Sequence, residues 1–257
     1  MAFPNFKGKH KEDAMFSPED WLAYLKEVGR YPRFKIPEGV VFCYSTSPPE
    51  EFLAEYKAKK VGEMLAERMY LLGKTGGRIA LVHRPSIGAP HVVALMDELI
   101  ALGVERFIIV GKAGTLQKHL DIENLVVCER AIRDEGTSHH YIRPSKYASA
   151  SKEMTARIKK ALDRRSLAYA AGTSWTVDAP YRETVEEARQ YQTEGVLTVE
   201  MEASALFAVA QLRRVEIGAL FTVSDSLAEL EWRPALHSPK LEKVFEQMCE
   251  VAVEVLL

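Results

Sequence analysis

The chain has 257 residues, of which 47% are hydrophobic and 27% are charged, and its formal net charge is only −2. These values predict a globular protein with a full hydrophobic core, and the small charge argues against nucleic acid or an anionic membrane as a partner. The longest apolar runs, such as 107–110, are too short to cross a bilayer. A polar N-terminus and three widely spaced cysteines favour a reduced, cytoplasmic protein, and no Cys/His cluster has the spacing of metal ligands.

Residues 1–38 form a polar segment with prolines and one short amphipathic helix after Ser17, and we expect an N-terminal appendage there. From residue 39 to 257, short apolar runs alternate with helical patterns. The runs predict strands near 40–44, 78–83, 107–110, 125–128, 167–171, 196–199 and 217–223. The helical patterns cover 50–60, 91–102, 151–165, 183–191, 205–212 and 241–256. This alternation predicts a single α/β domain with a central mixed, largely parallel sheet flanked by helices.

Polar segments follow most of the predicted strands. They are 45–49, 84–90, 111–114, 172–180 and 224–226. Ligands of such sheets gather at the carboxyl ends of the strands, so we expect the site at this edge. Glu200 and Glu202 lie at one strand-to-helix junction, where they are either ligand-binding groups or ordinary acids in the first turn of a helix.

Five segments occur in an order that is typical of one family. They are Gly88-Ala89-Pro90, Gly111-Lys112-Ala113-Gly114, Gly136-Thr137-Ser138, Val199-Glu200-Met201-Glu202-Ala203 and Ser224-Asp225. Together they resemble the nucleoside phosphorylase-I superfamily, which includes purine nucleoside phosphorylase, uridine phosphorylase and related nucleosidases. The resemblance covers residues 39–257 and implies a three-layer α/β/α fold. It also implies attack on the anomeric carbon of a nucleoside through an oxocarbenium-like transition state.

The resemblance implies roles for three acidic residues and for the methionine between two of them. Glu202 would accept hydrogen bonds from the 2′- and 3′-hydroxyls of ribose, Met201 would pack against the sugar, and Glu200 would be their less certain neighbour. Asp225 would protonate or hydrogen-bond N7 of a purine leaving group, whereas uridine phosphorylases usually lack an acid there. Segment 133–141 instead looks more like the uridine branch.

The base pocket matches the family less closely. Trp175 or Val177 occupies the position of a base-stacking aromatic residue, and Arg182 is one residue from the base-reading arginine of the uridine branch. Gly114 would complete this pocket. Core packing or surface exposure explains Trp175, Val177 and Arg182 equally well.

The phosphate site departs from the family pattern. A Gly-Asp-Pro-x-Arg turn is replaced by 44–51, which contains no arginine, and Ile109 stands where the family has a second arginine. Residues that could bind phosphate instead are Arg84, Lys112, Arg68 and His83, with the amides of Gly88 and Gly111.

Three functions therefore remain open. Phosphorolysis would use phosphate as co-substrate and no other cofactor. Hydrolysis would use Glu50 or Glu51, which lie near the water-activating glutamate of the nucleosidases. A third possibility is a non-catalytic relative that binds nucleosides. The resemblance also implies a homo-oligomer, either a dimer or a trimer of dimers.

Overall fold

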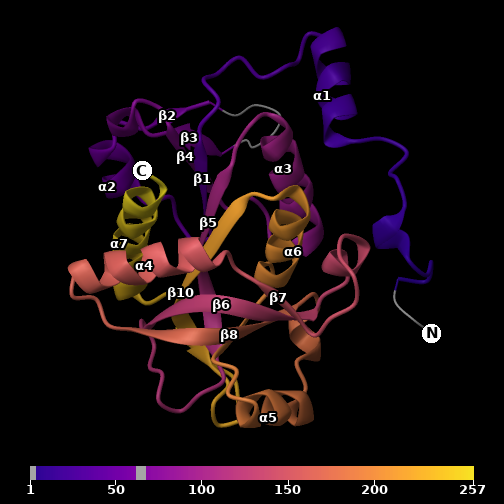
Figure 1. Cartoon of the computed structure of the whole chain (residues 1–257). Coiled ribbons are helices and arrows are strands. Elements are labelled where there is room, and N and C mark those ends of the chain that lie inside the picture. Colours follow the sequence, from indigo (N-terminus) through magenta and orange to yellow (C-terminus); the bar gives the residue numbers. More distant parts are fainter. Residues whose placement is uncertain (1–3, 62–67) are drawn as a thin grey trace.

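The computed structural model describes residues 4–61 and 68–257 (Figure 1). Its helices are α1 (Pro18–Glu27), α2 (Glu50–Glu55), α3 (Ala89–Ala101), α4 (Lys152–Arg164), α5 (Val185–Thr193), α6 (Ala203–Arg213) and α7 (Pro239–Leu256). Its strands are β1 (Gly39–Cys43), β2 (Lys59–Lys60), β3 (Met69–Leu71), β4 (Ile79–His83), β5 (Arg106–Thr115), β6 (Leu125–Asp134), β7 (Tyr147–Ser149), β8 (Tyr169–Val177), β9 (Thr198–Glu200), β10 (Glu216–Ser226) and β11 (Arg233–Pro234). Short 3₁₀ turns are η1 (Lys9–Lys11), η2 (Gly73–Thr75), η3 (Thr137–His140) and η4 (Pro180–Arg182).

All strands belong to one mixed sheet, which confirms the predicted single α/β domain. The strands β4, β1, β5 and β10 run parallel to one another in its middle. The strands β5, β9, β8, β6 and β10 each pair with the next, and β10 pairs back with β5, so they close into a ring. Because the central strands share one direction, the residues that follow β1, β4, β5 and β10 emerge at one edge of the sheet.

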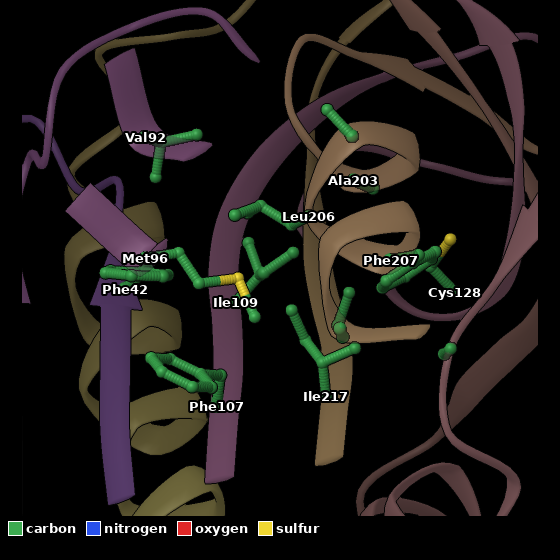
Figure 2. Close-up of a cluster of buried hydrophobic side chains, with 14 of the residues drawn as sticks. Phe42, Val92, Met96, Phe107, Ile109, Cys128, Ala203, Leu206, Phe207 and Ile217 are labelled. Carbon is green, nitrogen blue, oxygen red and sulfur yellow. The ribbon is translucent and has the colours of Figure 1, made fainter. Parts of the chain in front are cut away.

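Helices cover both faces of the sheet (Figure 1). Phe42 of β1 and Phe107 of β5 stack with 5.7 Å between ring centroids and belong to the cluster formed with α3 and α6. Figure 2 shows this cluster, with Met96 of α3 among the strand side chains. The alternate residues Val41 and Ile108 belong to the cluster on the other face, with α4 and α7. Burial on both faces explains why these strands are continuous apolar runs in the sequence.

Several elements differ in length from the sequence-based prediction. Helix α2 ends at Glu55 rather than near residue 60, because Lys57 adopts a left-handed φ of 49° and the chain then enters β2. Strand β5 continues to Thr115, so residues 111–114 are part of a strand and not a turn. Strand β8 likewise includes 172–177, which the sequence predicted as a loop. Long-range pairing with β10 and β6 stabilises both extensions, and local sequence does not reveal such pairing.

The predicted appendage carries α1, which lies apart from the sheet and contacts α3 (Figure 1). A capping box starts this helix, because the Ser17 hydroxyl accepts a hydrogen bond from Asp20 N while the Asp20 carboxylate accepts one from Ser17 N. The boundary at residue 38 and the role of the segment stay predictions. Within the two described ranges, no helix is both long and apolar enough to cross a membrane.

Candidate active site at the carboxyl edge of the sheet

Glu200 is the last residue of β9 and organises the turn into α6. Its Oε2 accepts hydrogen bonds from the N–H groups of Glu202 and Ala203, at 2.8 and 2.7 Å. Its Oε1 accepts one from Thr176 Oγ1 of β8 at 2.5 Å. The first amides of a helix lack partners within the helix, so this carboxylate caps α6. Burial nevertheless raises the pKa of Glu200 to about 7. Glu200 therefore supports the turn, and its direct contact with ribose stays a prediction.

Glu202 lies immediately before α6 and faces the loop that follows β4. Gly88 N donates a hydrogen bond to Glu202 Oε1 at 2.6 Å. The sequence predicted that this amide binds phosphate, but in the structure it binds the carboxyl group of Glu202. Burial, followed by the negative charge of Glu200, raises the pKa of Glu202 to about 8. The side chain is only 8% exposed, while Met201 beside it is partly exposed. A hydroxyl that reached Glu202 would meet a desolvated acceptor, which strengthens a hydrogen bond.

The loop that carries Gly88 has a strained backbone. Arg84, Ser86 and Gly88 have φ values of 46°, 111° and 95°. Positive φ is uncommon for residues other than glycine, and strained segments of this kind concentrate at ligand-binding sites. Arg84 N also donates to the carbonyl of Cys43 at 2.7 Å, which joins the start of the loop to the end of β1.

Asp225 lies near the end of β10. Ser224 Oγ donates to its Oδ1 at 2.7 Å, and Trp232 Nε1 donates to its Oδ2 at 3.0 Å. A Cβ on Gly114 would come within 2.9 Å of Asp225 Oδ2 and 3.2 Å of a Val199 methyl group. Only glycine therefore lets β5, β9 and this carboxylate approach one another. Asp225 is held beside β9, the strand that leads into residues 200–202, the acidic turn.

Two residues near Asp225 were missed in the sequence. Glu183 follows η4, and burial, followed by the negative charge of Asp225, raises the pKa of Glu183 to about 7. Trp232 is 62% exposed although its indole binds Asp225. Trp232 reaches this position because β11 folds back on β10. Neither residue belongs to a motif, so no local signal could have identified them.

The predicted basic residues lie at the same edge of the sheet. Burial lowers the pKa of His83, and the positive charges of Arg68 and Arg84 lower it further. Burial also lowers the pKa of Lys112, with a further contribution from Arg84. Lys112 Nζ donates to Thr46 Oγ1 at 2.5 Å. Arg68 and Arg84 thus lie near His83, and Arg84 also lies near Lys112, so positive charges gather around the end of β4.

The predicted base-binding residues occupy different environments. Trp175 is fully buried, its Nε1 donates to Asp134 Oδ2 at 2.9 Å, and its ring meets Tyr191 edge-on at 5.0 Å. Val177 is also buried, in the same hydrophobic cluster. Arg182, at the end of η4, is exposed. No face of Trp175 is open to a ligand in this arrangement, and stacking on the base stays a prediction.

The segment 133–141 supports α6. Glu135 accepts hydrogen bonds from Ser138 N and from Ser204 Oγ, both at 2.8 Å. Arg133 Nε donates to Ser138 Oγ at 2.8 Å. These buried contacts join the segment to the first turn of the helix that follows the acidic motif.

A cavity of about 920 Å³ opens beside Lys112. Its lining includes residues 45–51, and therefore Glu50 and Glu51, but neither Glu202 nor Asp225. Lys112 and the two acids considered for water activation thus line the same cavity. Across residues 4–61 and 68–257, no three His, Cys, Asp or Glu side chains are grouped so that they could hold a metal ion.

Comparison with known families explains this arrangement. The model of the phosphorylase superfamily matches residues 40–257. The chain belongs to this superfamily. The match confirms the resemblance found in the sequence and places the protein among the nucleoside phosphorylases, which are pentosyltransferases.

Relatives of different base specificity resemble the chain to a similar degree. Guanosine phosphorylase of Halorubrum lacusprofundi is 28% identical over 171 residues, which cover 66% of this chain and 71% of that protein. Purine nucleoside phosphorylase DeoD-type of Caldanaerobacter subterraneus subsp. tengcongensis is 30% identical over 214 residues, or 77% and 90% of the two chains. The crystal structure of uridine phosphorylase from Vibrio fischeri ES114 superposes with a TM-score of 0.71 at 26% identity, covering 86% of this chain and 91% of that one. The fold is therefore shared by purine and uridine enzymes.

Proposed function

We propose that the protein cleaves the N-glycosidic bond of purine nucleosides with phosphate, giving free base and pentose 1-phosphate. The observation that supports this most is the position of Asp225, whose carboxylate accepts hydrogen bonds from Ser224 and Trp232 and lies against Gly114 of β5. A leaving purine needs a proton or a hydrogen bond at N7, and uracil has no such atom. General acid assistance of this kind contributes on the order of 10²–10⁴-fold to the rate.

In this proposal Glu202 binds the sugar. A carboxylate can accept hydrogen bonds from two neighbouring hydroxyls at once. Its desolvated position next to Gly88 favours strong bonds to such donors. Glu200 fixes the turn that orients Glu202, because it binds the amides at the start of α6.

Phosphate binds at the basic edge, where Arg84, Lys112 and Arg68 replace the arginines of the family pattern. Hydrogen bonds to charged groups contribute about 1.5–3 kcal/mol each, so two of them suffice to hold the anion below the sugar. Lys112 is the best supported of the three, because it lies on β5 two residues before Gly114, the strand partner of Asp225.

Hydrolysis is the second candidate, and the position of Glu50 and Glu51 disfavours it. Both are exposed residues in the first turn of α2. Acids at a helix start interact favourably with the helix dipole, which explains them without catalysis.

The test is base release from inosine, adenosine, uridine and methylthioadenosine, with and without phosphate. We expect release that requires phosphate and is faster for the purine nucleosides. Release that does not depend on phosphate would replace phosphorolysis with hydrolysis. An inert protein that still binds these nucleosides would support the non-catalytic alternative.

We also propose that the enzyme works in the cytoplasm as a homo-oligomer, a dimer or a trimer of dimers, with phosphate as co-substrate and no metal or organic cofactor. Light scattering after size-exclusion chromatography measures the oligomeric state. Because no metal is proposed, the enzyme should keep its full activity after treatment with a chelator.

A further inference from the structure

Tyr44 lies at the sheet edge that carries the site, directly after β1. Its backbone N–H donates to the carbonyl of Val110 at 2.8 Å, which keeps it alongside β5. A Cβ on Gly111 would lie 4.0 Å from Tyr44 Cβ, so the side chain leaves the backbone close to a glycine of β5. Its hydroxyl oxygen is buried, and it has no hydrogen-bond partner among residues 4–61 and 68–257.

The electrostatic surroundings of this hydroxyl include the acidic turn. Burial raises the pKa of Tyr44 well above its usual value, and the negative charges of Glu202 and Glu200 raise it further. The phenol therefore keeps its proton and acts as a hydrogen-bond donor at neutral pH. Glu202 and Glu200 belong to the acidic turn, so the hydroxyl lies within electrostatic range of that turn.

We propose that Tyr44 Oη donates a hydrogen bond to the pentose hydroxyl that itself donates to Glu202, so that the two residues together select ribonucleosides over deoxyribonucleosides. A hydroxyl group can donate one hydrogen bond and accept two others. The sugar hydroxyl donates one hydrogen bond to Glu202 and accepts another from Tyr44, so it acts as both donor and acceptor. Buried polar groups without partners are rare and costly, and a ligand hydroxyl removes that cost.

This inference rests on the proposed function, because it needs a nucleoside at Glu202. Phosphate is the other ligand with acceptor atoms in this site. The sugar is favoured because the buried, unpartnered hydroxyl lies close enough to Glu202 and Glu200 for their charges to raise the pKa of Tyr44.

The experiment compares the wild type, Tyr44→Phe and the control Tyr56→Phe on inosine, 2′-deoxyinosine and 3′-deoxyinosine. Tyr56 is a suitable control because it is partly buried at the end of α2, against Phe52, in the cluster on the other face of the sheet. We expect Tyr44→Phe to lower kcat/KM for inosine by about 2–10-fold, the range of one neutral hydrogen bond. It should have no further effect on the deoxynucleoside that lacks the partner hydroxyl, as in a double-mutant cycle.

A thermal melt without ligand supplies the second measurement. Tyr44→Phe removes a hydroxyl that has no protein partner, so it should melt at the same temperature as the wild type or higher. A lower melting temperature would mean that the hydroxyl has a structural role, and it would overturn the proposal. An unchanged preference for inosine over both deoxynucleosides, or a rise in the KM for phosphate alone, would also overturn it.

Failure of the proposed function is recognised separately, because the wild type itself would then release no base. Calorimetric titration with inosine decides the inference in that case. Weaker binding by Tyr44→Phe than by the wild type and Tyr56→Phe would support the sugar contact. Equal affinity for all three proteins, or no binding by any of them, would refute it.

Discussion

The acidic and basic ends of the site are prepared for their ligands in different ways. Glu200, Glu202 and Asp225 are each held by hydrogen bonds from neighbouring groups. In contrast, within the described part of the chain the guanidinium groups of Arg68 and Arg84 make no hydrogen bond or ion pair. A buried carboxylate without partners is costly, whereas an exposed cation is stabilised by water. The acidic end is therefore held by the protein itself, whereas Arg68 and Arg84 are free to bind the anion of the proposed reaction.

The largest effect should come from the acidic end. Glu202→Ala removes the proposed acceptor for two sugar hydroxyls, and each charged hydrogen bond contributes about 1.5–3 kcal/mol. We expect kcat/KM for inosine to fall by about 10²–10⁴-fold. Steady-state assays of base release measure this loss. Circular dichroism should show an intact fold, because Glu200 still caps α6.

Glu153→Ala is the matched control, since Glu153 is an exposed glutamate in the first turn of α4. It should retain full activity. If Glu202→Ala were as active as this control, the sugar would bind elsewhere and the acidic end would serve only to start α6.

A smaller effect is expected at the leaving group. Asp225→Asn keeps a side chain that Ser224 and Trp232 can still contact but removes the acid. Turnover of inosine should fall by about 10²-fold, at the lower limit of general acid catalysis. Turnover of uridine should change much less, because uracil has no N7. Equal losses for inosine and uridine would show that Asp225 positions the loop and does not assist a purine.

Substitutions at the basic end should raise the KM for phosphate. Arg84→Met and Lys112→Met each remove one cation, and each should raise that KM by about tenfold while the KM for inosine stays constant. Arg30→Met, an exposed arginine of the appendage, is the control. A rise in the KM for inosine instead would assign these cations to the nucleoside.

The sequence predicted the acidic end better than the surroundings of the base. Glu202 and Asp225 could be found because they belong to short motifs next to strands, where chain order alone decides their position. Trp175 shows the limit, because the sequence predicted a loop there and does not reveal that the indole binds Asp134 inside a hydrophobic cluster. Glu183 and Trp232 were missed because only tertiary contacts bring them to Asp225.

The same distinction applies to the fold. The alternation of strands and helices follows from local hydrophobic periodicity, and it predicted the α/β class. The ring of five strands does not follow from it, because the ends of β5 and β8 are strands only through partners far away in the sequence. The residues 111–114 illustrate this, since two glycines suggest a turn but here allow close approach of Phe221 and Asp225.

The smallest predicted effect concerns the pH dependence of stability. It should appear at the buried acidic end and not at the exposed basic end. Burial raises the pKa of Glu202 to about 8 and that of Glu200 to about 7 in the folded protein, above the usual value of about 4.3. The folded state then binds more protons than the unfolded state between these limits. Stability from these groups is fully present below about pH 4.3 and is lost as the pH rises through about 7 to 8.

Glu202→Gln should therefore reduce the decrease in melting temperature between about pH 7 and about pH 8.5. One unit of pKa shift corresponds to about 1.4 kcal/mol, and about 1 kcal/mol changes the melting temperature of a chain of this size by about 2–4 °C. We expect a difference of a few degrees between the two melting curves across this range. Arg84→Met should follow the wild type at every pH, because an exposed guanidinium stays charged throughout. Parallel curves for the wild type and Glu202→Gln would show that the acidic end is ionised before any ligand arrives.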